Sequence, residues 1–167
     1  AVATGTEAPM QAVVNIDHRD DHSHGNYLTA PAPIISHHLC KENVESTGID
    51  HYPTAFVQPD WGNLELRAPT ITFDTRMDLW AGDTVVELHT MVGVAHTTND
   101  IVAWLPAEGV LYTGDLVFHG GTPFVLMGSV QGSIDSLEVL RGFGADTIVP
   151  GHGKVTGPQV FDDIERY

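Results

Sequence analysis

The chain has few of the residues that mark secreted, membrane or nucleic-acid-binding proteins. Its single cysteine, Cys40, cannot form an intrachain disulfide, which excludes a small domain held together by disulfides. Basic residues are also scarce: seven Lys and Arg stand against 22 Asp and Glu, and the formal net charge is -15. Such a balance repels phosphate backbones and anionic membrane surfaces, so we expect neither nucleic acid nor a membrane as a partner.

Long apolar runs are missing as well. No stretch approaches the roughly 20 apolar residues that a membrane helix needs, and the first residues lack the basic-then-apolar pattern of a signal peptide. We therefore expect a cytoplasmic protein. Hydrophobic residues make up 42% of the chain and charged residues 17%, which is typical of a compact globular protein. The length of 167 residues predicts one domain, spanning 1–167.

Short β-branched runs alternate with turn residues through much of the chain. The runs at 11–16 and 33–36 predict buried strands, and the alternation of apolar residues over 70–80 predicts a single longer strand. Two further apolar runs, joined by PAEG at 106–109, predict a hairpin. Strands interleaved with helices favour an α/β sandwich whose sheets pack together under outer helices.

Helices are predicted in three places. The segment 37–48 ends in Gly48, a residue that commonly terminates helices. The segment 131–146 places apolar residues on one face, with Ser133 as its expected N-cap and Gly142 or Gly144 at its end. A last helix is expected to begin near residue 157.

Histidines and aspartates follow several of these strands. They lie in VVNIDHRDDHSHGN (13–26), GVAHTTND (93–100), YTGDLVF (112–118) and IVPGHG (148–153). A lone His after a strand is more often a hydrogen-bonding residue than a metal ligand, and Gly-Asp is common at turns. The four segments carry weight only together, because imidazoles and carboxylates from several strand ends can hold a metal ion.

Together with GGTPFVLMGS (120–129), these segments resemble the metallo-β-lactamase superfamily, in which a strand delivers NTHxHxDH to a two-metal hydrolytic centre and later loops bring His, Asp and His. The resemblance implies an αββα sandwich, here without the N-terminal segment and the C-terminal helices usual in the family. Matching Asn15 to the family's Asn places Asp17 and Arg19 at the first two His positions. The metal ligands that the resemblance then implies are Asp21, His22, His96, Asp115 and His152.

Arg19 is the largest departure from the family pattern. A guanidinium has no lone pair to give a metal and stays protonated. Its fixed charge would repel a second cation, so we predict one ion, zinc with iron and manganese as alternatives, bound by Asp21, His22 and His152. Arg19 would instead pair with Asp17 and Asp115 or orient an anionic group of a substrate. The predicted catalytic residues are Asp21, Asp115 and Arg19.

Two other interpretations of the loop stay open at this point. A register slip of one residue would offer His18 and Asp20 as ligands, although adjacent residues of an extended segment point to opposite sides. Alternatively, Asp21, His22 and their partners persist as a hydrogen-bonded polar cluster without a metal.

The resemblance implies an enzyme that acts on a small-molecule substrate. We expect a metal-dependent hydrolase, similar to bacterial members described as aromatic polyketide cyclases and thioesterases, whose metal activates water or polarises a carbonyl. The alternative is a degenerate, non-catalytic member that acts as an interaction or scaffold protein. Such a subunit would form a homo-oligomer or complete its sheet with a second chain.

Overall fold

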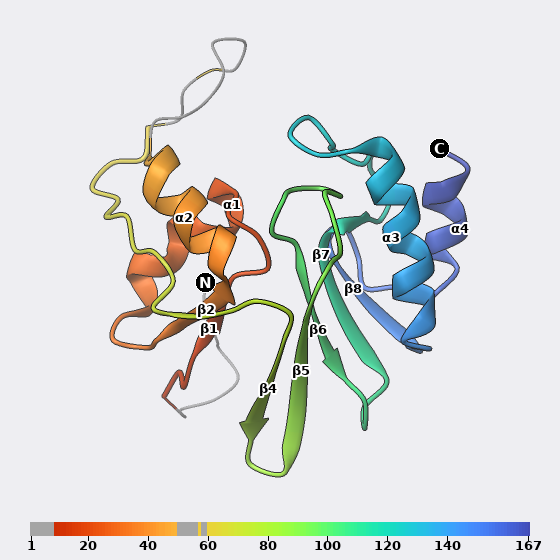
Figure 1. Ribbon diagram of the computed structural model, residues 1–167, viewed down its shortest axis with the longest axis horizontal. Helices are drawn as coiled ribbons and strands as arrows, with labels where there is room; N and C mark the ends of the chain where they lie inside the picture. Colours follow the sequence, from red (N-terminus) through yellow and green to blue (C-terminus); the bar gives the residue numbers. More distant parts are fainter. Residues whose placement is uncertain (1–8, 50–56, 58–59) are drawn as a thin grey trace.

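The computed structural model describes residues 9–49, 57 and 60–167, which form two sheets between outer helices (Figure 1). The first sheet is parallel and has the order β1-β2-β3, and the second has the order β4-β5-β6-β7-β8, antiparallel except between β7 and β8. The strands are β1 (Val13–Val14), β2 (Ile34–His37), β3 (Ile71–Phe73), β4 (Arg76–Ala81), β5 (Thr84–Thr90), β6 (Ile101–Leu105), β7 (Val110–Phe118) and β8 (Thr147–His152).

The helices lie on the outer sides of the two sheets (Figure 1). They are α1 (Asp20–Ser23), the short 3-10 helix η1 (His24–Thr29), α2 (His38–Thr47), α3 (Val130–Gly142) and α4 (Val160–Glu165). Helices α1 and α2 accompany the first sheet, whereas α3 and α4 cover the second. The layering confirms the predicted αββα sandwich. None of the helices in the described residues has the length and apolarity that a membrane span requires.

Two apolar cores hold these layers together. Between the sheets, Ile35 and Phe73 pack with Leu88 and Ile101 of the opposite sheet. Between the second sheet and its helices, the core contains the buried side chains Leu111, Leu137, Leu140, Ile148, Val160 and Phe161. Each such side chain stabilises the fold by about 1.5–3 kcal/mol relative to an exposed position. The cores therefore fix the strand ends from which the polar residues project.

The segment predicted as one strand over 70–80 is in fact two. Strand β3 ends at Phe73 in the first sheet, and β4 begins at Arg76 in the second. Phe73 and Met77 nevertheless pack into the same core between the sheets. The apolar alternation continues across the break because the chain changes sheets without changing cores. Periodicity alone could not reveal this crossing.

The predicted helix ends are partly confirmed. Gly48 ends α2 with a φ of 69°, and its N–H bonds to the carbonyl of Val44. Helix α3 begins earlier than expected, since its N-cap is Ser129, whose Oγ accepts the N–H of Gly132 at 3.1 Å. The prediction of Ser133 as N-cap was therefore wrong. Gly144, with a φ of 66°, follows the end of α3.

Candidate metal centre

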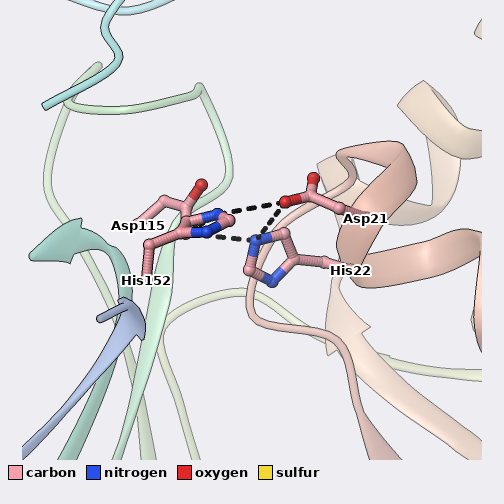
Figure 2. Close-up of side chains that lie close together, drawn as sticks. All are labelled: Asp21, His22, Asp115 and His152. Carbon is pink, nitrogen blue, oxygen red and sulfur yellow. Dashed lines mark ion pairs between the residues drawn. The ribbon is translucent and has the colours of Figure 1, made fainter. Parts of the chain in front are cut away.

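Strand ends from the two sheets meet at one edge of the sandwich. Asp21 and His22 lie on α1, which follows β1, whereas Asp115 lies in β7 and His152 at the end of β8 (Figure 2). His96 lies in the loop between β5 and β6. The structure thus brings together all five metal ligands that the sequence predicted.

The first cluster contains Asp21, His22, Asp115 and His152. His22 Nε2 lies 3.1 Å from Asp115 Oδ1, and His152 Nε2 lies 3.1 Å from Asp21 Oδ2. His152 Nε2 is also 3.4 Å from Asp115 Oδ1. One ligand atom from each of the four residues lies within 4.8 Å of the others. This spacing fits a single cation between them.

A second cluster contains Asp17, His96 and Asp115, and all three are buried. His96 Nε2 lies 3.3 Å from Asp115 Oδ2, so the two oxygens of Asp115 face the two clusters. Asp17 stands at the family's first His position and contributes a carboxylate in its place. Because the sequence predicted one ion, it did not count Asp17 among the ligands.

Four buried polar atoms of these clusters have no hydrogen bond within the described part of the chain: Asp17 Oδ2, His22 Nε2, His96 Nε2 and Asp115 Oδ1. A buried polar group without a hydrogen bond costs about 1–3 kcal/mol, and here four converge on one space. No Lys or Arg of the described residues forms an ion pair with the three carboxylates. Imidazole and carboxylate donors in this state fit a divalent zinc, iron or manganese ion.

Neighbouring groups orient the candidate ligands. His96 Nδ1 donates to the carbonyl of Phe124 at 2.6 Å, which leaves Nε2 as the atom facing the site. The ring of His152 stacks on Phe118 with centroids 4.9 Å apart. Asp17 Oδ1 accepts the backbone N–H of Arg19 at 2.7 Å, so its other oxygen faces the cluster. These contacts therefore orient three of the candidate ligands toward the clusters.

Burial and the neighbouring charges shift the pKa values of several side chains in the two clusters. Burial raises the pKa of Asp17 to about 6, although His22 works in the opposite direction. For His22, burial favours the neutral ring, but the carboxylates of Asp115, Asp17 and Asp21 outweigh it and raise the pKa to about 9. Burial would raise the pKa of Asp115, yet the adjacent His22 holds it below its usual value. In the metal-free protein His22 is therefore protonated at neutral pH, and a metal must displace that proton.

Arg19 does not enter the metal clusters. Its guanidinium carbon lies 4.9 Å from the centroid of the Phe124 ring, and Nη1 donates to the sulfur of Met127 at 3.4 Å. The expected ion pairs with Asp17 and Asp115 are absent from the described residues, and this expectation was wrong. Sequence reasoning missed Phe124 and Met127, because no local signal connects them to a side chain more than 100 residues earlier.

The alternative register receives no support from the geometry. His18 is buried, and its Nδ1 accepts a hydrogen bond from Asn99 Nδ2 at 2.9 Å. Neither His18 nor Asp20 belongs to the two clusters.

A hollow of about 320 Å³ adjoins the first cluster. Three of the candidate ligands contribute to its wall, together with Arg19, two aromatic rings and one further carboxylate. The lining residues are Arg19, Asp20, Asp21, Asp115, Phe118, Phe124 and His152. The hollow can therefore admit a small molecule to the side chains that would hold the metal.

Comparison with solved structures shows the same fold in metallo-beta-lactamases. A metallo-beta-lactamase from Pontibacter korlensis has a TM-score of 0.77 and 18% identity, covering 97% of this chain and 71% of its own. The structure of TMB-1 has a TM-score of 0.75 and 17% identity, and the match covers 96% of this chain and 68% of that one. The DIM-1 metallo-beta-lactamase exposed to ceftazidime has a TM-score of 0.73 and 16% identity, with 93% of this chain and 66% of that one covered. The chain thus spans about two thirds of the length of these structures.

Comparison with curated proteins gives no match. The profile of the Metallo-beta-lactamase superfamily, in contrast, matches residues 20–152, which is most of the sequence and contains the candidate ligands from Asp21 to His152. On this match, and with the αββα fold and the position of the clusters, the chain belongs to the metallo-beta-lactamase superfamily.

Proposed function

We propose that the protein is a metal-dependent hydrolase that adds water to the carbonyl group of a small-molecule substrate. One observation carries the proposal: four buried polar atoms, from Asp17, His22, His96 and Asp115, converge without hydrogen bonds among the described residues. Without a metal these groups contact one another: His22 Nε2 lies 3.1 Å from Asp115 Oδ1, His96 Nε2 lies 3.3 Å from Asp115 Oδ2, and the buried Oδ2 of Asp17 has no hydrogen bond among the described residues. A divalent ion would offset this concentration of buried carboxylates. Membership of the family alone would not suffice, since one fold supports many chemistries.

The first cluster is the proposed site of the catalytic ion. Asp21, His22, Asp115 and His152 would hold zinc, with iron and manganese as alternatives. A divalent ion at this position supplies Lewis acidity, which polarises a carbonyl oxygen and lowers the pKa of water toward neutrality. The cluster of Asp17, His96 and Asp115 fits a second ion with two carboxylates and one imidazole.

Side chains of the protein would position the attacking water and transfer its proton. Asp21 is half exposed at the hollow, and its Oδ2 contacts His152 Nε2, so Oδ1 is left to hold the attacking water. As the water oxygen bonds to the carbonyl carbon, Asp21 accepts the proton. The bond from this carbon to the leaving group breaks, and the proton passes to the leaving group. Phe118, stacked on His152, keeps that ring in place.

Thioesters belong to the proposed substrate class. The sequence from Gly114 to Leu140 resembles that of polyketide cyclases and thioesterases, and thioester hydrolysis and ring closure both begin with a polarised carbonyl. An assay that measures the free thiol monitors the hydrolysis of an acyl thioester. A cyclase would convert its substrate without releasing the thiol, so the same assay separates the two activities.

Metal content tests the proposal. After exposure to zinc and dialysis, plasma emission should find about one or two equivalents per chain. Asp21→Ala should lower this content, whereas Asp163→Asn, which changes an exposed carboxylate on α4, should not. Zinc content near zero in the native chain would contradict the proposal, and an Asp21→Ala variant with unchanged content would contradict the ligand assignment.

One observation favours the non-catalytic alternative, in which a second chain completes the sheets. A hollow of about 330 Å³ lies between them and is lined by the apolar side chains of Val14, Ile16, Val86, Ala103, Leu105 and Tyr112. Exposed apolar surface of this kind is typical of an interaction site. Size-exclusion chromatography with mass measurement separates the two proposals, because a well-folded monomer that binds zinc contradicts the scaffold role.

A further inference from the structure

Arg19 forms no ion pair with an acidic side chain in the part of the chain that the structure describes, although the sequence is strongly acidic. No carboxylate of the described residues lies within ion-pair distance of its guanidinium, even though Asp20 and Asp21 follow it directly. Two of the other arginines behave differently, since Arg76 pairs with Asp78 and Glu87, and Arg141 pairs with three carboxylates. Arg67 also forms no ion pair among the described residues, but its guanidinium donates to backbone carbonyls and a hydroxyl. The positive charge of Arg19 is therefore available to a ligand.

Two side chains hold this guanidinium in place without neutralising it, and one of them, Phe124, lines the hollow. The face of the Phe124 ring lies under it, and the sulfur of Met127 accepts a hydrogen bond from Nη1. Nε and Nη2 have no acceptor among the described residues. A guanidinium presents its donors as a planar fork that matches the two oxygens of a carboxylate. Arg19 thus has both free donors and a fixed orientation.

The location connects this charge to the proposed chemistry. Arg19 lines the same hollow as Asp21, Asp115 and His152, which belong to the first metal cluster. Phe118 and Phe124 supply apolar wall between them. A substrate whose carboxylate binds Arg19 would lay its apolar part on these rings and present its carbonyl to the metal.

We propose that Arg19 determines specificity for acyl substrates that carry a carboxylate in addition to the scissile carbonyl. This proposal rests on the proposed function, because the hollow also contains the carboxylates of Asp20, Asp21 and Asp115. These would repel an anionic ligand from the metal-free protein. A divalent ion bound to Asp21 and Asp115 offsets that repulsion, so carboxylate recognition is a property of the metal-loaded protein.

Two esters with acyl chains of equal length test the proposal on the zinc-loaded protein. They are 4-nitrophenyl pentanoate, which is neutral, and mono-4-nitrophenyl glutarate, which ends in a carboxylate. The native chain should favour the glutarate ester in kcat/KM. Arg19→Gln should reduce this preference about tenfold or more, mainly through KM, because a hydrogen-bonded charge pair is lost. Its zinc content should stay unchanged, and its kcat/KM for the neutral ester should fall less than that for the glutarate ester.

Two further variants control the experiment. Arg166→Gln removes an exposed arginine near the end of α4 and should keep the preference. Arg19→Lys should restore part of it, since lysine keeps the charge but lacks the planar fork. If Arg19→Gln lowers both esters equally and leaves the preference intact, the specificity proposal is overturned while the hydrolase stands.

A binding measurement covers the case in which neither ester is cleaved. The Arg19 Nε–H resonance of the zinc-loaded protein is followed by NMR during titration with sodium glutarate. A saturable shift of this resonance, which the signals of the other arginines do not show, supports the carboxylate site without any catalysis. Arg166→Gln should leave the shift of the Arg19 signal unchanged. The absence of a shift in the native chain overturns the proposal. A chain that binds no zinc contradicts the proposed function and, since its three carboxylates then stay uncompensated, this proposal as well.

Discussion

Asp115 Oδ1 lies 3.1 Å from His22 Nε2, and this contact joins the two sheets of the molecule. Asp115 belongs to β7 of the second sheet, whereas His22 lies on α1 beside the first. Their proximity raises the pKa of His22 to about 9 and lowers that of Asp115, in both cases against the effect of burial. The geometry of the candidate metal centre therefore depends on the packing of the two sheets.

Replacing Asp115 should disrupt both metal clusters at once. Asp115→Asn keeps the shape of the side chain but removes the charge that the two clusters share. We expect zinc affinity to fall by about a hundredfold or more, measured by calorimetric titration. The pKa of His22 in the metal-free variant should fall toward 6.5, because its strongest carboxylate neighbour is lost.

Asp135→Asn provides the matched control for this substitution. Asp135 is an exposed residue of α3, and its carboxylate accepts a hydrogen bond from Gln131. Zinc affinity and the His22 titration should both match the native chain. Unchanged zinc affinity in Asp115→Asn would show that Asp115 does not bind the metal.

The metal-free protein should lose stability as pH rises from about 4 to about 9. The folded pKa of His22 is about 9 against an unfolded value of 6.5, so its contribution is present below 6.5 and lost as pH rises through 9. The folded pKa of Asp17, about 6 against 3.8, acts in the same direction at lower pH. Asp115 has a lowered pKa, so its own contribution is lost only as pH falls below 3.8.

Calorimetry with and without metal checks this dependence. With a chelator present, Tm should fall between pH 6 and pH 9. With zinc present the decline should be smaller, because the ion replaces the proton on His22 and binds better as pH rises. A Tm that stays level over this range in the chelated protein would contradict the raised pKa of His22.

The sequence predicted the position of those candidate ligands that lie in clear local patterns of strand and glycine. Asp115 lies within β7 and His152 at the end of β8, each beside a glycine, and the structure brings the two together as expected. The direction of Arg19 could not be predicted in this way, since a long side chain adopts whichever orientation its distant neighbours allow. Phe124 and Met127, which hold it, are brought near only by the tertiary fold.

The crossing between β3 and β4 was hidden for a related reason. Alternation reports which side chains face an apolar core, and Phe73 and Met77 face the same one. It does not report the sheet to which each strand bonds its backbone, which depends on strand partners elsewhere in the chain. Ile35 pairs with Ile71 in β3, while Leu88 pairs with Met77 in β4, and neither pairing has a local signal.

Asp17 and Arg19 together should determine how many ions bind. The double substitution Asp17→His with Arg19→His gives the first motif the two histidines of the family pattern, and it should raise the zinc content of the chain. The reason is geometric: Asp17 Oδ2 already faces the cluster that contains His96 and Asp115. Plasma emission on dialysed protein measures the change.

Asp17→Asn tests the same cluster in the opposite direction. It should lower the zinc content only if the second cluster binds an ion in the native chain, because Asp21, His22 and His152 are left intact. If the double histidine variant holds no more zinc than the native chain, Asp17 and Arg19 do not occupy the positions of the family's histidines.

Gly151 should be essential for the position of Asp115. A Cβ added at Gly151 would lie 2.0 Å from Asp115 Oδ1 and 2.8 Å from the backbone nitrogen of Asp115, far inside contact distance. Gly151→Ala must therefore displace either β8 or the carboxylate, and we expect a loss of about 1–3 kcal/mol in the free energy of unfolding together with weaker zinc binding. Chemical denaturation and calorimetric zinc titration measure the two effects.

Gly142→Ala is the matched control, because a Cβ there meets nothing within 4 Å and the residue lies in the last turn of α3. Alanine favours helix over glycine, so this variant should be as stable as the native chain or slightly more stable, with unchanged zinc affinity. The comparison separates crowding at the metal centre from the general effect of adding a methyl group. A Gly151→Ala variant that matches Gly142→Ala in both measurements would show that β8 can move away from Asp115 without disturbing the ligands.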